Sequence, residues 1–339
     1  MLDKIKLSGN VDNINPQGAC KIANSKRDKL NRQYIPILIP NRDKTEFLIF
    51  KYYERPYECI IEGNLRRWWF GIKSLNDLDY IDFKNALSLI TKRLGIAESI
   101  LYDFEVKKIE LGANIKLPSS SAPIIQMFMS YPKLQRKSYE KGSVYFTGKK
   151  YAIIFYDKLL EMKDNGILKN KIYEKVSKQI FILRIEKKIW AKSGVSFGGK
   201  IKTLRDVSEN WGFLADDWLD ILHKVKFVDL FDNTKNFKLK SLTPKENLEF
   251  LAYSFMNLHG LERCLDLSKI YLKNRKSETV NRLINIFNKF RSNEKRVFFT
   301  ETYNTAVKKY NSLKFGVPRN RKVYPHLDNI ESIDTKTNS

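Results

Sequence analysis

Apolar and polar residues alternate along several stretches of the first 190 residues, and Val, Ile, Tyr and Phe are enriched there. A period of two places successive side chains on opposite faces of a β-strand. Pro, Gly, Asn and Ser separate the stretches, as turns require. The pattern predicts strands at Asp3–Leu7, Pro36–Pro40, Phe47–Tyr53, Glu58–Asn64, Phe104–Leu117, Ser143–Phe146, Tyr151–Lys158 and Phe181–Trp190.

Helical spacing interrupts these strands twice. Apolar residues recur along Phe83–Leu94, with Asp82 as the expected N-cap and Gly95 just past the end. A weaker helical segment covers Leu168–Lys178. Strands with a few helices in no strict alternation predict an α+β fold with a largely antiparallel sheet.

The pattern becomes helical after about Arg205. Thr243-Pro244-Lys245-Glu246 has a capping residue, a proline in the first turn and a glutamate three residues after the cap, which is typical of a helix start. Helices are expected at Trp211–Val225, from Pro244 to about Leu258, Glu262–Lys273 and Glu278–Phe290. We therefore expect a first domain at 1–205, a mainly helical region at 206–325 and a polar, disordered tail at 326–339.

Charge and composition narrow the classes of partner. The 339 residues include 62 Lys+Arg against 38 Asp+Glu, a net charge of +24. This excess favours a polyanion, nucleic acid before membrane, although part of it reflects a chain rich in Lys and Asn throughout. No stretch approaches the roughly 18 to 20 apolar residues of a membrane span. The opening MLDKIKLSG lacks the apolar core of a secretory signal.

Cysteine and histidine are too scattered to form a metal site of their own. The cysteines Cys20, Cys59 and Cys264 have no paired spacing, which suggests a reducing compartment and no zinc site. The three histidines lie far apart along the chain. A divalent ion would therefore need oxygen ligands, which favours Mg²⁺ or Mn²⁺.

Three predicted strands carry chemically competent groups on their polar faces. Lys108, Glu110 and Asn114 share one face of the first, Tyr156 and Lys158 one face of the second, and Arg184, Glu186 and Lys188 one face of the third. Each glutamate follows a cation by two residues, which would keep the carboxylate ionised for a metal. Solvated carboxylates in ordinary ion pairs, and a tyrosine that only packs, remain the alternative.

The run Arg66-Arg67-Trp68-Trp69-Phe70 interleaves cations with aromatic rings. Such a run can stack on unpaired bases. A strand with two buried rings and a solvated face explains it equally well.

The order of these motifs resembles that of the replication initiators of filamentous phages and the related rolling-circle initiators of small plasmids. The matching residues are Lys108-Ile109-Glu110 with Asn114, Tyr156-Asp157-Lys158 with Glu161, and Arg184-Ile185-Glu186, together with the opening MLDKIKL and the segment Ile61–Gly71. The resemblance spans roughly Met1 to Asp220. The chain departs from the family pattern with Glu at 110 in place of Asp and Lys at 108 in place of Arg. It also lacks the histidine pair that more distant rolling-circle nucleases use for the metal.

The resemblance implies a site-specific DNA nickase. Tyr156 would attack a phosphodiester at the replication origin, form a 5′-phosphotyrosyl link and free a 3′-OH, and the reverse reaction would reseal the strand. Lys158 would assist the tyrosine, and Mg²⁺ or Mn²⁺ would be held by Glu110, Glu186, Glu62 and Asn114. Expected DNA contacts are Lys108, Arg184, Lys149, Arg66 and Arg67.

The implied partners are origin DNA, duplex and single-stranded, and the helicase and polymerase of a bacterial host, in whose cytoplasm the protein would act. The helical region would contact the duplex through phosphates. Two alternatives stay open: a non-catalytic DNA-binding initiator, and a metal-dependent nuclease that uses water and leaves no protein–DNA adduct.

Overall fold

The structure is a computed structural model, and it describes residues 1–11, 14–17, 20–53, 58–122, 124–139, 142–190, 199–227, 243–259, 261, 263–266, 276–291 and 297–315. The strands are β1 (Leu2–Asn10), β2 (Lys21–Ile22), β3 (Lys26–Arg27), β4 (Gln33–Pro40), β5 (Phe47–Tyr52), β6 (Glu58–Asn64), β7 (Glu105–Pro118), β8 (Phe128–Ser130), β9 (Gln135–Tyr139), β10 (Ser143–Thr147), β11 (Tyr151–Asp157), β12 (Ile180–Trp190) and β13 (Lys226–Phe227). The helices are α1 (Leu65–Phe70), α2 (Tyr80–Leu94), α3 (Glu98–Tyr102), α4 (Ile124–Met127), α5 (Lys158–Asp164), α6 (Asn170–Ser177), α7 (Leu204–Glu209), α8 (Trp211–Lys224), α9 (Pro244–His259), α11 (Lys276–Arg291) and α12 (Val297–Phe315), with a 3₁₀ turn at Ser119–Ser121.

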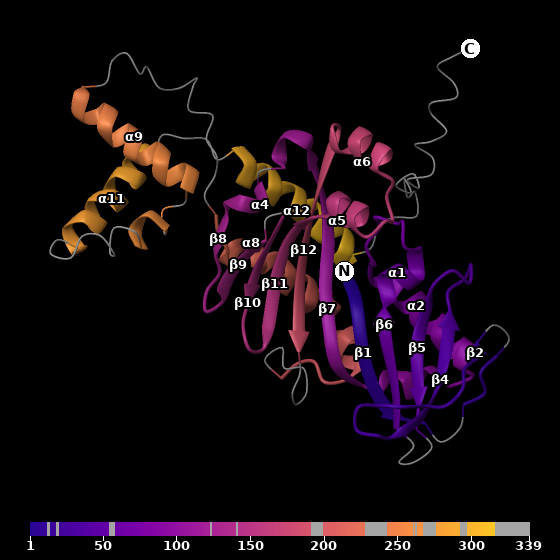
Figure 1. Cartoon of the computed structure of the whole chain (residues 1–339). Coiled ribbons are helices and arrows are strands. Elements are labelled where there is room, and N and C mark those ends of the chain that lie inside the picture. Colours follow the sequence, from indigo (N-terminus) through magenta and orange to yellow (C-terminus); the bar gives the residue numbers. More distant parts are fainter. Residues whose placement is uncertain are drawn as a thin grey trace, which may run out of the picture.

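One large antiparallel sheet organises the molecule (Figure 1). Its strand order is β2-β4-β5-β6-β1-β7-β12-β11-β10-β9, with β3 also paired to β4, and every recorded pairing in it is antiparallel. The α+β prediction with a largely antiparallel sheet is confirmed. All eight predicted strands are present, and the strands that alternation did not predict are short ones such as β2, β3 and β13.

Long helices cover one face of this sheet. Ile109, Leu111 and Ala113 of β7 share a core with α2, α8 and α12. The indole N–H of Trp218 in α8 donates to the carbonyl of Ile185 in β12 at 3.2 Å, which fixes that helix against the sheet. The opposite face is covered by α5 and α6 at one end of β12, and Figure 1 views the sheet from this second face.

The hydrophobic core does not end at the expected domain boundary near residue 205. Leu204, Trp211 and Trp218 belong to the same core as the strands, and so do Ala306 and Leu313 of α12. Helices α9 and α11 form a separate cluster around Tyr253 and Phe287, beside the sheet in Figure 1. Helices α7, α8 and α12 therefore belong structurally to the sheet, and residues 326–339 lie outside the described residues.

One local prediction was wrong, one of two alternatives is excluded, and one prediction is confirmed. The N-cap of α2 is Asp79, whose side chain accepts from the Asp82 N–H at 2.8 Å; the helix begins earlier than its apolar spacing indicated. The segment around Trp68 is helix α1, capped by Asn64, and is not a strand. Thr243 caps the start of α9 as predicted, with reciprocal hydrogen bonds to Glu246.

Candidate functional site

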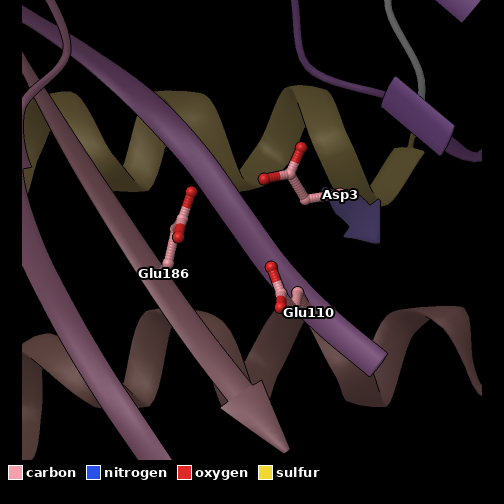
Figure 2. Close-up of side chains that lie close together, drawn as sticks. All are labelled: Asp3, Glu110 and Glu186. Atoms are coloured by element: carbon pink, nitrogen blue, oxygen red, sulfur yellow. The ribbon is translucent and has the colours of Figure 1, made fainter. Parts of the chain in front are cut away.

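Three carboxylates converge on the second face of the sheet. Asp3, Glu110 and Glu186 come from β1, β7 and β12, which are neighbours in the sheet. One oxygen of each lies within 4.8 Å of the others, and all three residues are at most 5% exposed. Figure 2 shows the three side chains projecting from the strands toward one space. Such a cluster places three anionic oxygens at the separation that ligands of one divalent ion adopt.

Strand register explains the convergence. Glu110 lies opposite Lys188 of β12 and Lys4 of β1, and Glu186 lies opposite Gly112. Residues directly opposite in antiparallel strands share a face. Asp3 joins them through an irregularity: Leu2 pairs with Leu111 and Lys4 with Glu110, so one extra residue is inserted in β1. This β-bulge at Asp3 re-aims a side chain that strict alternation would place with Ile5.

Arg184 holds two of the three carboxylates, Asp3 and Glu186, in place. Its side chain is fully buried and contacts Asp3 at 2.8 Å and Glu186 at 2.7 Å. To reach Asp3 on β1 it must cross β7, and it does so above Gly112. A Cβ on that glycine would lie 2.7 Å from the Arg184 Nη2 atom and 3.1 Å from the Glu186 Cγ atom. Only glycine leaves this passage open.

A second layer of buried polar groups supports Arg184. Its Nη1 atom lies 2.9 Å from the Asn114 side-chain oxygen and 3.2 Å from Asp77. Asp77 is fully buried in the segment before α2 and accepts from the Asn114 backbone N–H at 2.9 Å. Lys309 of α12 reaches the same carboxylate at 2.7 Å. The C-terminal helix is thus connected to the site through Lys309, Asp77 and Arg184.

The surrounding cations keep Asp3 and Asp77 ionised. Burial alone would raise the pKa of Asp3, but Arg184 and Arg66 hold it well below its usual range. Burial is likewise overcome at Asp77, where Lys309 and Arg184 lower the pKa to about 2. The pKa directions follow from opposite charges a few ångströms away in a buried setting.

Tyr156 lies beside this cluster on β11. Its hydroxyl donates to the Glu186 Oε1 atom at 2.7 Å. Burial raises the pKa of Tyr156 well above 10; Arg184 opposes the rise, and Glu186 adds to it. The phenol is therefore neutral at rest, with its proton directed at a carboxylate.

Lys158 begins α5 one residue beyond the strand end. Its ammonium lies 5.9 Å from the centre of the Tyr156 ring and 2.5 Å from Glu161. Burial lowers the pKa of Lys158, and Arg184 lowers it further, while Glu161 opposes this. Asp157 caps α5 by accepting from two backbone N–H groups, which fixes the turn from strand to helix.

A pocket of about 370 Å³ opens onto these groups. Its lining includes Asp3, Arg66, Tyr156, Lys158, Glu186 and Lys188. Arg66 is buried and donates through Nε to Asp3 at 3.0 Å, so it faces the pocket from α1 while anchored to the cluster. The pocket combines a phenol, carboxylates and several cations in one cavity.

The structure does not bring every predicted site residue to this pocket. Glu62 lies on the same face but pairs with Lys6 at 3.4 Å and Lys51 at 2.5 Å, outside the carboxylate cluster. Asn114 lies behind Arg184 and orients it. Arg67 is exposed in a pair with Glu46 at 2.8 Å.

Lys149 is exposed in the turn between β10 and β11. Tyr156 lies at the other end of β11. At about 3.3 Å per strand residue, the two are separated by roughly 20 Å along the hairpin. Lys108 is close to the site, because its ammonium is 2.6 Å from Glu110.

Sequence reasoning missed Asp3, Asp77 and Gly112. Asp3 was visible as the acidic residue of the first strand, but alternation assigns it to the wrong face. Asp77 lies in an irregular segment, where no periodicity indicates direction. Gly112 lies in the interior of a long predicted strand, and a glycine there is a signal of close approach by another group.

The donor set suits a hard divalent cation. The Glu110 Oε2 atom is buried and has no hydrogen-bond partner among the described residues, although Lys4 lies 3.5 Å away. A buried carboxylate oxygen without a hydrogen bond is costly unless another positive group satisfies it. Together with oxygens from Asp3 and Glu186, it fits Mg²⁺ or Mn²⁺ in its donor chemistry.

Comparison with known proteins gives no match, either to a protein-family model or to a curated protein. The site therefore has to be interpreted from its own chemistry. Among the helices in the described part of the chain, none combines the length and apolarity needed to cross a membrane.

Proposed function

We propose that the protein is a DNA nickase and strand transferase that uses Tyr156 as its nucleophile, in the manner of a rolling-circle replication initiator. The observation that carries the proposal is the 2.7 Å hydrogen bond from the Tyr156 hydroxyl to Glu186, inside a pocket lined by carboxylates and cations. The net charge of +24 supports a polyanionic substrate.

In this proposal the phenol oxygen attacks the phosphorus of a phosphodiester. The Tyr156 proton passes to Glu186, the new O–P bond forms, and the bond from phosphorus to the 3′-oxygen breaks. The departing 3′-oxygen takes a proton from water. Lys158 and Arg66 face the pocket and stabilise the negative charge that develops on the phosphoryl oxygens.

Asp3, Glu110 and Glu186 would hold Mg²⁺ or Mn²⁺, which would polarise a non-bridging phosphate oxygen when bound. Arg184 keeps Asp3 and Glu186 oriented for this role. Because the phosphotyrosyl bond retains the energy of the phosphodiester, attack by a 3′-OH reverses the step and reseals the strand.

The test of the nucleophile is a covalent adduct. A pool of 3′-labelled single-stranded oligonucleotides of random sequence is incubated with the protein and Mn²⁺, then separated on a denaturing gel. The label should move with the protein, since the 5′-phosphate of the downstream fragment joins the tyrosine. Tyr156→Phe should remove the adduct, and Tyr151→Phe, at the other end of β11, should not.

Three results would contradict this proposal. Cleavage without an adduct would indicate a nuclease that uses water, and DNA binding with neither product would indicate a non-catalytic initiator. An adduct that persists in Tyr156→Phe would assign the nucleophile to another residue.

The metal site is tested by Mn²⁺ binding, measured by titration calorimetry without DNA. Asp3→Asn and Glu110→Gln each remove one anionic oxygen and should weaken binding at least tenfold. Glu62→Gln is the matched control, because Glu62 lies on the same sheet face but outside the cluster. Equal affinity in all three variants would place the ion elsewhere.

A further inference from the structure

The face of the sheet that carries the site continues as an open surface beyond it. Pairing Lys4 with Glu110 and Lys6 with Lys108 places these residues on the face of Glu186. The same register continues through Glu62 of β6 to Ile49 of β5. In Figure 1 this part of the sheet, from β12 through β7 and β1 to β5, lies in front and directly visible.

Five lysines and one tryptophan define a track on this surface. Its members are Lys188, Lys108, Lys4, Lys6, Lys51 and Trp190. They span five neighbouring strands, which at about 4.8 Å per strand is roughly 19 Å. Lys4 and Lys188 also line the pocket, so the lysine track runs directly into the site.

The track holds a surplus of positive charge. Glu110 is contacted by two lysines, Lys4 at 3.5 Å and Lys108 at 2.6 Å. Glu62 is likewise shared by Lys6 at 3.4 Å and Lys51 at 2.5 Å. One carboxylate cannot neutralise two ammonium groups, so one positive charge remains at each pair.

Three of the five lysines are well exposed and available to a ligand. The side chains of Lys4, Lys6 and Lys108 are 44%, 40% and 35% exposed. The Glu62 side chain is 29% exposed, so solvent screens its ion pairs and Lys6 can turn toward a phosphate at little cost. Lys108 can stay beside the buried Glu110 carboxylate and still contact a phosphate, because an ammonium group has three donors.

Trp190 adds an apolar platform at the β12 end. Its residue is 42% exposed and lies opposite Lys108, on the same face. An exposed indole beside cations is the combination that holds unpaired bases, because the ring stacks on the base while the cations contact the backbone. Duplex DNA presents its bases stacked inside, where Trp190 could not reach them without unpairing.

We propose that the lysine track binds single-stranded nucleic acid next to the nick site, with Trp190 stacked on a base and Lys108 and Lys6 on phosphates. The proposal rests on the proposed function only for the position of the strand relative to Tyr156. The track deepens that function by assigning the path of the strand across the sheet to named residues.

The test is equilibrium binding of a labelled oligonucleotide, measured by fluorescence anisotropy in the Tyr156→Phe background, where no adduct is expected. Trp190→Ala should weaken single-strand binding by roughly 5- to 150-fold. Trp190→Phe, which retains an aromatic ring, should stay within a few-fold. The binding constant should fall less steeply with salt in the double variant Lys6→Ala, Lys108→Ala. The slope of the logarithm of the binding constant against the logarithm of the salt concentration should decrease in magnitude by about 1.4, since each phosphate contact contributes about 0.7 on a single strand.

Lys92→Ala is the control, because Lys92 is exposed on α2, which packs on the opposite face. The track proposal would be overturned if the track variants kept the native affinity and salt dependence. It would also be overturned if the protein bound the duplex of the same sequence more tightly than the single strand. The adduct assay with the protein carrying native Tyr156 separates the two proposals. If the adduct forms but the track variants bind single strands with native affinity, the nickase proposal holds and the track proposal fails. If the track variants bind more weakly but no adduct forms, the track proposal holds and the nickase proposal fails.

Discussion

Replacing Arg184 by methionine tests the organisation of the whole site. Arg184 is fully buried and contacts Asp3, Glu186 and Asp77 at 2.8, 2.7 and 3.2 Å. Removing one partner of a buried ion pair costs about 3–5 kcal/mol, because the remaining charges lose their compensation. We therefore expect Arg184→Met to lower the free energy of unfolding by about 3–5 kcal/mol at pH 8, measured by urea denaturation.

The deficit of Arg184→Met should also depend on pH. In the native protein Arg184 depresses the pKa of Asp3, so this carboxylate stabilises the fold above its unfolded pKa and loses that contribution on acidification. Without Arg184, Arg66 still opposes the effect of burial, so the folded pKa of Asp3 rises toward the unfolded value. The contribution that the variant lacks is present in the native protein above an unfolded pKa of about 3.9 and is lost progressively below it, so the deficit of Arg184→Met should shrink between about pH 5 and pH 3.

Arg205→Met supplies a matched control. Arg205 also contacts a carboxylate, Asp103, at 2.8 Å, but their side chains are 46% and 68% exposed. Solvent already screens that pair, so its loss should leave the free energy of unfolding nearly unchanged. A deficit for Arg184→Met as small as that of the control, or one that stays equal between about pH 5 and pH 3, would refute the reasoning about the buried network.

Two further predictions concern the groups around Arg184. Gly112→Val should block the passage of its side chain and destabilise the protein by about 1–3 kcal/mol, whereas Gly212→Ala, whose Cβ meets only the flexible end of a lysine, should be neutral or stabilising in thermal unfolding. Lys309→Met should cost about 2 kcal/mol, because buried Asp77 loses an ion pair of 2.7 Å; equal stability of this variant and the native protein would show that α12 does not support the site. The pKa of Asp77 is lowered to about 2, so its stabilising contribution is present above about pH 4 and is lost as the pH falls toward 2; Asp77→Asn should flatten that part of the stability profile.

The sequence by itself determined which segments form the main strands and on which face of a strand most side chains lie. Alternation predicted the strands correctly because one face of each is buried against helices, and a period of two is the direct consequence. For the same reason, Glu110 and Glu186 could be assigned to polar faces, each beside a cation two residues earlier, and the structure has both pairs at 2.6–2.7 Å.

Only the tertiary structure decided which of these groups meet. Strand order placed β1 beside β7 and β12, and no local pattern specifies the order of strands that are far apart in the chain. The bulge at Asp3 changes its face, which alternation cannot indicate.

Asp77 and Lys309 lie in segments more than 200 residues apart in the sequence. They form an ion pair in the folded protein, because a charge that is removed from water requires a counter-charge. The boundary near residue 205 marked a real change from strand to helix. Helices α8 and α12 nonetheless pack on the sheet, because their apolar faces and the apolar face of the sheet are both removed from water by this contact.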